Sequence, residues 1–171
     1  MIQSTVADLF ASEIKQTEVE VKGWVKSFRA NRFIALSDGS TLKTIQCVLD
    51  YETMDENLLK RISIGASVHV KGNLVESQGK GQSLEIKVEH ISILGAADPE
   101  LVSKTILQPK RHSLEFLREQ AHLRPRTNTF GAIMRLRSSL SFAIHQYFHQ
   151  NGFNYMHAPI ITGSDAEGAG E

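Results

Sequence analysis

The segment Glu18-Val19-Glu20-Val21-Lys22-Gly23-Trp24-Val25 alternates between polar and apolar residues. A period of two is typical of a β-strand that buries one face and exposes the other. Gly23 falls at a position that suits a bend in a barrel strand. The segment therefore predicts the first strand of a small β-domain.

Four more strands and one helix are expected downstream, because apolar residues recur there at strand or helix spacing. The predicted strands cover residues 32–37, 42–49, 65–75 and 84–94, and the predicted helix covers residues 51–62. Three strands, a helix and two strands form the element order of a five-stranded OB-fold barrel, with the helix between strands three and four. We expect this mostly β domain to occupy residues 1–95.

The composition is that of an ordinary globular protein. The 171 residues are 41% hydrophobic, which suffices for the cores of one or two small domains. No stretch approaches the roughly 20 apolar residues that cross a bilayer, and no secretory leader follows Met1. The single cysteine, Cys47, rules out an internal disulfide. We therefore expect a cytoplasmic protein with no membrane partner.

The net charge is zero, but the charges are unevenly distributed. Lys22, Lys26, Arg29 and Arg32 follow one another with no acidic residue between them. A second basic section runs from residue 110 to residue 137 and contains only two glutamates. Local basic stripes can attract a phosphate backbone, and the alternative is two solvated faces. The charge pattern alone leaves both interpretations open.

Residues 96–125 lack sustained periodicity and are expected to form a hinge. Residues 96–100 are typical of a turn, and residues 114–119 of a short helix. The sequence Arg124-Pro125-Arg126 breaks this section before the last part of the chain begins.

Residues 126–171 begin with a long amphipathic helix, N-capped by Asn128 or Thr129. Its apolar face comprises Ile133, Leu136, Leu140, Ile144 and Tyr147. Gly152 fits the position just past the helix end. A strand that contains Pro159 is predicted next, at an edge or a bulge, because proline donates no hydrogen bond to a sheet.

Three residues of the predicted barrel are candidates for nucleic-acid binding, because an OB-fold commonly presents the outer face of strands two and three to a single strand. Phe33 on strand two offers a ring for base stacking, and Arg29 lies in the preceding connection. Gln46 on strand three carries an amide that matches the uracil edge. The alternative places Phe33 in the barrel core and Gln46 in solvent. Cys47 follows Gln46 and is expected to face the barrel interior.

Other polar groups carry weaker signals. Glu167 lies on a loop rich in glycine and alanine, where a carboxylate binds an ammonium group or is merely solvated. His145 and His149 lie four residues apart on the predicted helix, but no third ligand is evident. The sequence therefore predicts no metal site.

Several segments resemble a known enzyme family. Gly152-Phe153 followed by Ala158-Pro159-Ile160-Ile161 resembles the first signature motif of class II aminoacyl-tRNA synthetases. Residues 111–118 and 122–127 resemble the hinge and the catalytic-domain entry of the asparagine/aspartate/lysine subgroup. Within that subgroup, residues 164–171 are most similar to the asparaginyl-tRNA synthetases.

The resemblance implies an ATP-dependent asparagine–tRNA ligase, of which this chain is an N-terminal fragment. It implies an anticodon-binding OB-fold, a hinge at residues 96–125, and the first helix and strand of an α+β catalytic domain at residues 126–171. The whole enzyme would use asparagine, ATP and Mg²⁺ and form a homodimer. The fragment would bind the tRNA anticodon and be inactive alone, with no bound cofactor and no catalytic residue of its own.

The resemblance also assigns roles to single residues. Phe33 matches the aromatic residue that stacks on the middle anticodon uridine, Gln46 matches the glutamine that reads that base, and Arg29 falls near an anticodon-contacting arginine. Glu167 matches the carboxylate that holds the α-ammonium of the amino acid. Gly152, Phe153 and Pro159 match the dimer interface, so the apolar face of the long helix is expected to be exposed here. The alternatives are a fragment of an aspartyl enzyme, including one that charges both tRNAs, and a stand-alone RNA-binding module.

Overall fold

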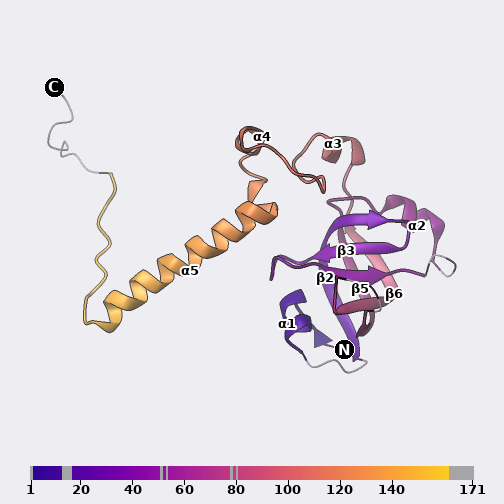
Figure 1. Cartoon of the computed structure of the whole chain (residues 1–171), viewed down its shortest axis with the longest axis horizontal. Coiled ribbons are helices and arrows are strands. Elements are labelled where there is room, and N and C mark those ends of the chain that lie inside the picture. The colour runs from indigo at the N-terminus through magenta and orange to yellow at the C-terminus, as the bar shows by residue number, and fades with distance from the viewer. Residues whose placement is uncertain are drawn as a thin grey trace. The chain divides into compact units, whose positions relative to one another are not determined.

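The computed structural model describes residues 2–12, 17–50, 52, 54–77, 79 and 81–161. The chain forms two compact units, Met1–Ala132 and Ile133–Glu171. In the first unit the strands curl around a common centre (Figure 1). These strands are β1 (Ile2–Gln3), β2 (Thr17–Arg29), β3 (Phe33–Ser37), β4 (Ile45–Val48), β5 (Ser67–Glu76) and β6 (Leu84–Gly95).

The sheet closes into a barrel because β2 pairs along its length with two different strands. Residues Thr17 to Trp24 pair with β5, and residues Trp24 to Arg29 pair with β3. From β3 the strand order continues through β4 and β6 back to β5. Helix α2 (Glu56–Arg61) lies between β4 and β5 in the sequence, so the predicted OB-fold barrel is confirmed.

Aliphatic side chains fill the barrel interior, because alternate residues of each strand point inward. These residues are almost fully buried and include Val19, Val21, Val25, Ile34, Leu36, Ile45, Cys47, Val68, Val70 and Ile86. Burying one such aliphatic side chain contributes about 1.5–3 kcal/mol. The predicted inward orientation of Cys47 is confirmed.

A β-bulge in β2 changes which of its residues point outward. The register between β2 and β3 shifts between Val25 and Ser27, so Lys26 has no opposite residue in that ladder. An extra residue reverses the alternation of side chains beyond the bulge. Phe28 consequently packs against the core, and Ser27 and Arg29 face outward.

Two glycines allow neighbouring strands to approach closely. A Cβ atom on Gly23 would lie 2.7 Å from the carbonyl oxygen of Ser37, and one on Gly72 would overlap the carbonyl oxygen of Lys87. Only residues without a side chain fit at these two positions. The close approach of β2 and β3 therefore requires glycine at position 23, where the sequence predicts a bend in the strand.

Helix α1 (Val6–Ala11) was not expected from the sequence pattern. Thr5 and Asp8 form a reciprocal capping box at its start. The carboxylate of Asp38 accepts the backbone N–H of Val6 at 2.8 Å, and Val6 and Leu9 are buried in the barrel core. The helix is therefore stabilised by a residue 32 positions away, which local periodicity does not reveal.

Two predicted elements are shorter than expected. Strand β4 begins at Ile45 rather than at residue 42, and helix α2 begins at Glu56 rather than at residue 51. The side chain of Asp55 accepts the N–H of Asn57 at 2.9 Å and so fixes the start of α2.

The section predicted as a hinge, residues 96–125, contains a helix where the sequence predicts a turn. Helix α3 (Pro99–Ser103) is capped by Asp98, which accepts the N–H of Glu100 at 2.8 Å, and Pro99 occupies its first position. The turn prediction for residues 96–100 is therefore wrong. Helix α4 (Leu114–Glu119) has the predicted bounds, and the 3₁₀ helix η1 (Arg124–Arg126) lies at the predicted break.

Helix α5 (Asn128–Gln150) begins in the first unit and continues into the second. The hydroxyl of Thr127 accepts the N–H of Phe130 at 3.4 Å, so the capping residue is Thr127 and neither Asn128 nor Thr129. None of the helices in the described part of the chain is both long and apolar enough to cross a membrane.

Gly152 ends α5, as predicted, with a positive φ of 83°. The N–H of Gly152 donates to the carbonyl of His149, and the N–H of Phe153 donates to that of Phe148, both at 3.1 Å. The rings of Phe148 and Phe153 pack edge to face at 5.5 Å, which completes a Schellman motif with its apolar contact.

Residues 153–161 form no strand, so the prediction of a strand around Pro159 is wrong for the described part of the second unit. A strand needs a neighbour to take up its backbone hydrogen bonds, and Pro159 has no N–H to donate. Among the described residues of this unit, no strand pairs with the segment.

We expect Gly72→Ala to destabilise the first unit by about 1–3 kcal/mol, because the backbone of β6 must move to admit a methyl group. Gly95→Ala is the matched control, since its Cβ would meet only the hydroxyl oxygen of Ser67, at 2.8 Å, which can rotate away. Urea unfolding followed by circular dichroism measures both changes. An equal loss of stability in the two variants would contradict the steric account.

Candidate nucleic-acid interface

The pairing of four strands places side chains in two rows on the outer face of the barrel. Strands β2, β3, β4 and β6 are neighbours in this order, and directly paired residues lie on the same face of a sheet. The first row is Arg29, Phe33, Val48 and Lys87, and the second row is Ser27, Ala35, Gln46 and Glu85. Their sequence neighbours Ile34 and Cys47 are completely buried, so both rows face outward.

Phe33 lies on this outer face and not in the core. It is half-buried, whereas Ile34 and Leu36 on the same strand are fully buried. The guanidinium of Arg32 lies 5.6 Å from the centroid of the Phe33 ring. The core alternative for Phe33 is therefore excluded, and the ring has a face that a planar group can stack on.

Gln46 lies in the second row beside Ala35 and Glu85. Its side-chain N–H donates to Oε2 of Glu85 at 3.4 Å, which is longer than a typical hydrogen bond. The hydroxyl of Ser77 donates to the same oxygen at 2.9 Å. Because Glu85 has this better partner, the amide of Gln46 can exchange its weak contact for a ligand at little cost.

Arg29 is the last residue of β2 and pairs directly with Phe33, so its predicted place in a connection is corrected. The connection that follows has only three residues, Ala30 to Arg32. Ala30 and Asn31 have φ values of 51° and 48°, and the N–H of Arg32 donates to the carbonyl of Arg29 at 3.0 Å. Two successive positive φ values and this hydrogen bond form a tight turn, after which Phe33 pairs with Arg29.

Cations flank the first row at both ends. Arg29 at one end and Lys87 at the other are exposed, with Phe33 and Val48 between them. A stacking ring between cations is the combination that single-stranded nucleic acid requires. The position of Lys87 depends on the parallel pairing of β4 with β6, which no local sequence signal indicates.

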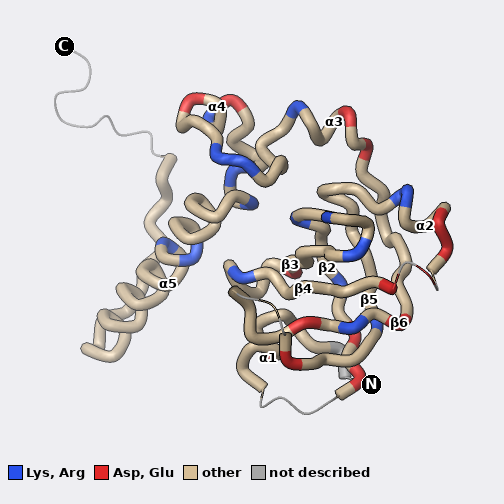
Figure 2. The backbone as a smooth tube through the Cα atoms, turned by 45° about the vertical axis from the view of Figure 1, so that its right-hand side comes forward, with Lys and Arg blue, Asp and Glu red and all other residues tan. Residues whose placement is uncertain are grey.

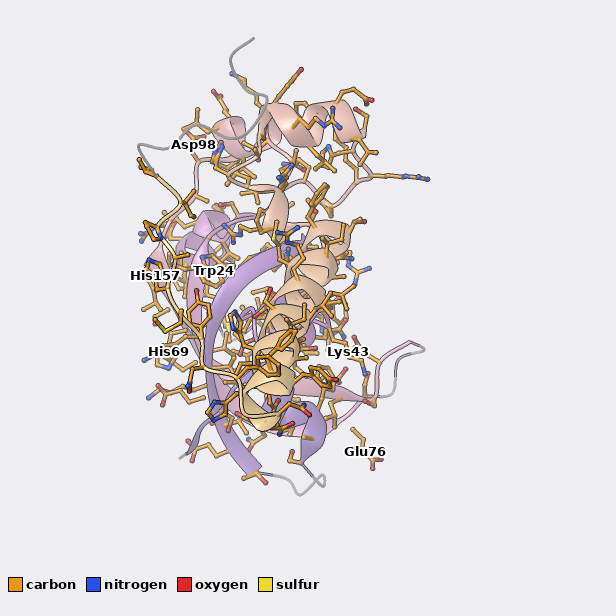
Figure 3. All side chains as sticks on the ribbon, turned by 90° about the vertical axis from the view of Figure 1, so that its left-hand side faces the viewer. Trp24, Lys43, His69, Glu76, Asp98 and His157 are labelled. Atoms are coloured by element: carbon orange, nitrogen blue, oxygen red, sulfur yellow. The ribbon has the colours of Figure 1, made fainter. Side chains whose placement is uncertain are left out.

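Trp24 and Lys26 connect the barrel to η1. The guanidinium of Arg126 lies 5.0 Å from the centroid of the Trp24 ring, which is labelled in Figure 3. The ammonium of Lys26 donates to the carbonyl of Arg126 at 2.5 Å. Burial lowers the pKa of Lys26, and the nearby positive charge of Arg126 lowers it further. These partners lie 100 residues apart, so the sequence alone could not pair them.

The second unit presents apolar and aromatic side chains around the end of α5. The ring of His145 packs edge-on against Tyr155 at 4.8 Å. Within the described part of the chain, no three His, Cys, Asp or Glu side chains cluster closely enough to hold a metal ion. Glu167 lies outside the described residues.

A family model described as an OB-fold nucleic acid binding domain matches residues 19–94, which include β2 to β6 almost completely. An asparagine–tRNA ligase from Parabacteroides distasonis is 51% identical over 172 residues, which cover 99% of this chain. Over this length the chain is a homologue of the asparaginyl-tRNA synthetases. It spans 36% of the length of that ligase and matches its N-terminal portion.

Solved structures show the same fold. The asparaginyl-tRNA synthetase of Pyrococcus horikoshii, complexed with asparaginyl-adenylate, matches with a TM-score of 0.77 and 21% identity, covering 99% of this chain and 39% of that one. An aspartyl-tRNA synthetase from Entamoeba histolytica matches with a TM-score of 0.70 and 18% identity, covering 92% and 39%. The same fold thus occurs in an asparaginyl-tRNA and an aspartyl-tRNA synthetase. The likeness of this chain to the asparaginyl-tRNA synthetases rests on its sequence identity to them.

We expect Cys47 of this asparaginyl-tRNA synthetase homologue to be inert towards thiol reagents while the barrel is folded. Burial raises the pKa of its thiol from 9.0 to about 12, and the thiolate is the reactive form. Ellman's reagent at about pH 8 should label Cys47 only after unfolding in urea. Rapid labelling of the native protein, at the rate of the unfolded control, would contradict the buried position.

Proposed function

We propose that this chain is the anticodon-binding portion of an asparagine–tRNA ligase that acts in cytoplasmic protein synthesis. The whole enzyme would activate asparagine with ATP and transfer it to the terminal hydroxyl of its tRNA. The proposal is supported by 51% identity over nearly the whole chain and by the OB-fold match to residues 19–94. Because the chain spans 36% of that relative, the chemistry itself is assigned to the rest of the enzyme.

The observation that carries the proposal is the arrangement of the two rows on the barrel. In this proposal the ring of Phe33 stacks on the middle anticodon base, and Arg29 contacts the anticodon. The amide of Gln46 reads the edge of the base. A uridine edge offers an N–H flanked by carbonyls, and one carboxamide can both donate to it and accept from it.

The division into domains is part of the same proposal. Residues 1–95 would form the anticodon-binding barrel, and residues 96–125 would form the hinge. Residues 126–171 would begin the class II catalytic domain. Glu167 in that last part would hold the α-ammonium of asparagine.

ATP and Mg²⁺ belong to the proposed activity of the whole enzyme. The described residues do not fit a Mg²⁺ site, since they contain no cluster of three acidic or other metal-binding side chains. We therefore assign no step of the reaction to this chain and expect it to be inactive alone.

The second unit supports a homodimer. The apolar face of α5 is exposed, as predicted, and so are further large apolar side chains of α5 and of the segment after it. The exposed side chains are Ile133, Leu136, Leu140, Phe142, Ile144, Tyr147, Phe148, Phe153, Tyr155, Met156, Ile160 and Ile161. Exposed apolar surface of this kind marks an interaction site. In this proposal Phe153 and Pro159 contact the second subunit, and Gly152 shapes the helix end that presents them.

We expect the chain to bind an anticodon stem-loop with GUU more tightly than stem-loops with GUC or GCU, at one fixed salt concentration. Phe33→Ala should weaken binding to the GUU loop by about 1–3 kcal/mol, the value of one stacked base, whereas Phe33→Tyr keeps the ring and should bind normally. Gln46→Ala should reduce mainly the preference for U over C at the middle position. Fluorescence anisotropy measures all these affinities.

The outcomes separate the proposal from its alternatives. Preference for GUC would indicate an aspartyl enzyme, and equal binding of GUC and GUU one that charges both tRNAs. Equal weak binding to all three loops would indicate an RNA-binding module without anticodon specificity. If Phe33→Ala bound the GUU loop with normal affinity, the ring of Phe33 would not be part of the binding site.

A further inference from the structure

A groove of about 1400 Å³ lies in the first unit, beside the second row of the interface. It includes Ser27 and Ala35 from that row, so the groove and the outer face of the barrel are continuous. Five cations line it, and they come from β2, the β3–β4 connection, the segment before α4, and η1. They are Lys26, Lys43, Lys110, Arg111 and Arg126.

No Asp or Glu of the described part of the chain lines this groove. Among the described residues, the ion pairs involve Lys60, His69 and Lys71, and none involves a cation of the groove. The segment that joins α4 to α5 carries two arginines, Arg124 and Arg126, in η1 (Figure 2). The groove is therefore a concentration of uncompensated positive charge in a chain whose net charge is zero.

Two of the cations are held together despite their like charge. The ammonium of Lys26 donates to the carbonyl oxygen of Arg126, and burial lowers the pKa of each side chain. An anion placed in the groove would relieve the repulsion between them and replace the water that burial removes. The groove thus has a physical preference for a negatively charged ligand.

Aromatic rings position two of the cations. The ammonium of Lys43, labelled with Trp24 in Figure 3, lies 5.3 Å from the centroid of the Phe10 ring. The guanidinium of Arg126 lies over Trp24. Stacking occupies a face of the guanidinium and leaves its N–H edge available, which is the edge that binds phosphate.

We propose that this groove holds the sugar–phosphate backbone of the RNA arm whose loop bases lie on the two rows of the barrel. The inference rests on the proposed anticodon binding and adds a second, sequence-independent contact surface to it. Its continuity with the second row favours RNA over an acidic peptide, because one ligand can then occupy both surfaces. The rows would read the bases, and the groove would bind phosphates.

The test compares two double variants that remove the same charge. Lys43→Gln with Lys110→Gln changes exposed residues of the groove, and Lys22→Gln with Lys60→Gln changes exposed residues outside it. The dissociation constant for GUU and GCU stem-loops is measured over a range of salt concentrations. Circular dichroism checks that both variants fold.

The logarithm of the association constant falls linearly with the logarithm of the salt concentration. Each lost phosphate contact makes this negative slope shallower by about 0.7–0.9, so the loss of two contacts makes it shallower by about 1.4–1.8. We expect this change in the groove variant, with the ratio of GUU to GCU affinity unchanged, and no change of slope in the control. An equal slope in the two variants would overturn the proposal, and so would a changed GUU-to-GCU ratio in the groove variant.

Failure of the two proposals can be distinguished. If the unsubstituted chain binds no stem-loop, or binds all without preference at every salt concentration, the proposed anticodon-binding function fails and the groove proposal with it. If the unsubstituted chain prefers GUU and the groove variant behaves like the control, only the groove proposal fails.

Discussion

The barrel depends on one strand, β2, pairing with two neighbours. Trp24 is the residue at which the pairing changes, since it lies opposite Ser67 on β5 and Ser37 on β3. This arrangement brings the backbones of β2 and β3 very close at Gly23, and β5 and β6 approach each other as closely at Gly72. It also requires a bulge at Lys26, because the second half of β2 must turn towards β3.

The same bulge creates the candidate interface. Strict alternation from Val19, Val21 and Val25 would continue inward at Ser27 and Arg29, and the bulge reverses it so that both face outward. Arg29 thereby becomes the neighbour of Phe33, and Lys26 is directed to the carbonyl of Arg126. A single extra residue in β2 therefore supplies one cation to the first row and another to the groove.

Much of the fold follows from local sequence. Period-two alternation predicts the five barrel strands, and the neighbours Gln46 and Cys47 are assigned to opposite faces because side chains alternate along a strand. Gly152 is recognisable because only a residue that tolerates positive φ ends a helix in this way. Phe33 and Gln46 could be selected from the sequence because each lies on a strand with a clear pattern.

The remaining features depend on partners distant in the sequence. Helix α1 is fixed by Asp38, Lys87 joins the first row only through the pairing of β4 with β6, and Arg126 reaches Trp24 across about 100 residues. Local periodicity carries no information about such contacts. The strand predicted around Pro159 is the opposite case. Its local pattern is typical of a strand, but no strand in the described part of the second unit pairs with it.

The central claim is that RNA lies on the outer face formed by β2, β3, β4 and β6 and extends into the adjoining groove. Titration of the ¹⁵N-labelled chain with a GUU anticodon stem-loop, followed by two-dimensional NMR, tests it most directly. The account predicts that the largest shifts occur at the amides of Arg29, Phe33, Ala35 and Gln46 and at the groove residues before α4. Shifts confined to the other side of β2, around Lys22, His69 and Lys71, would contradict it.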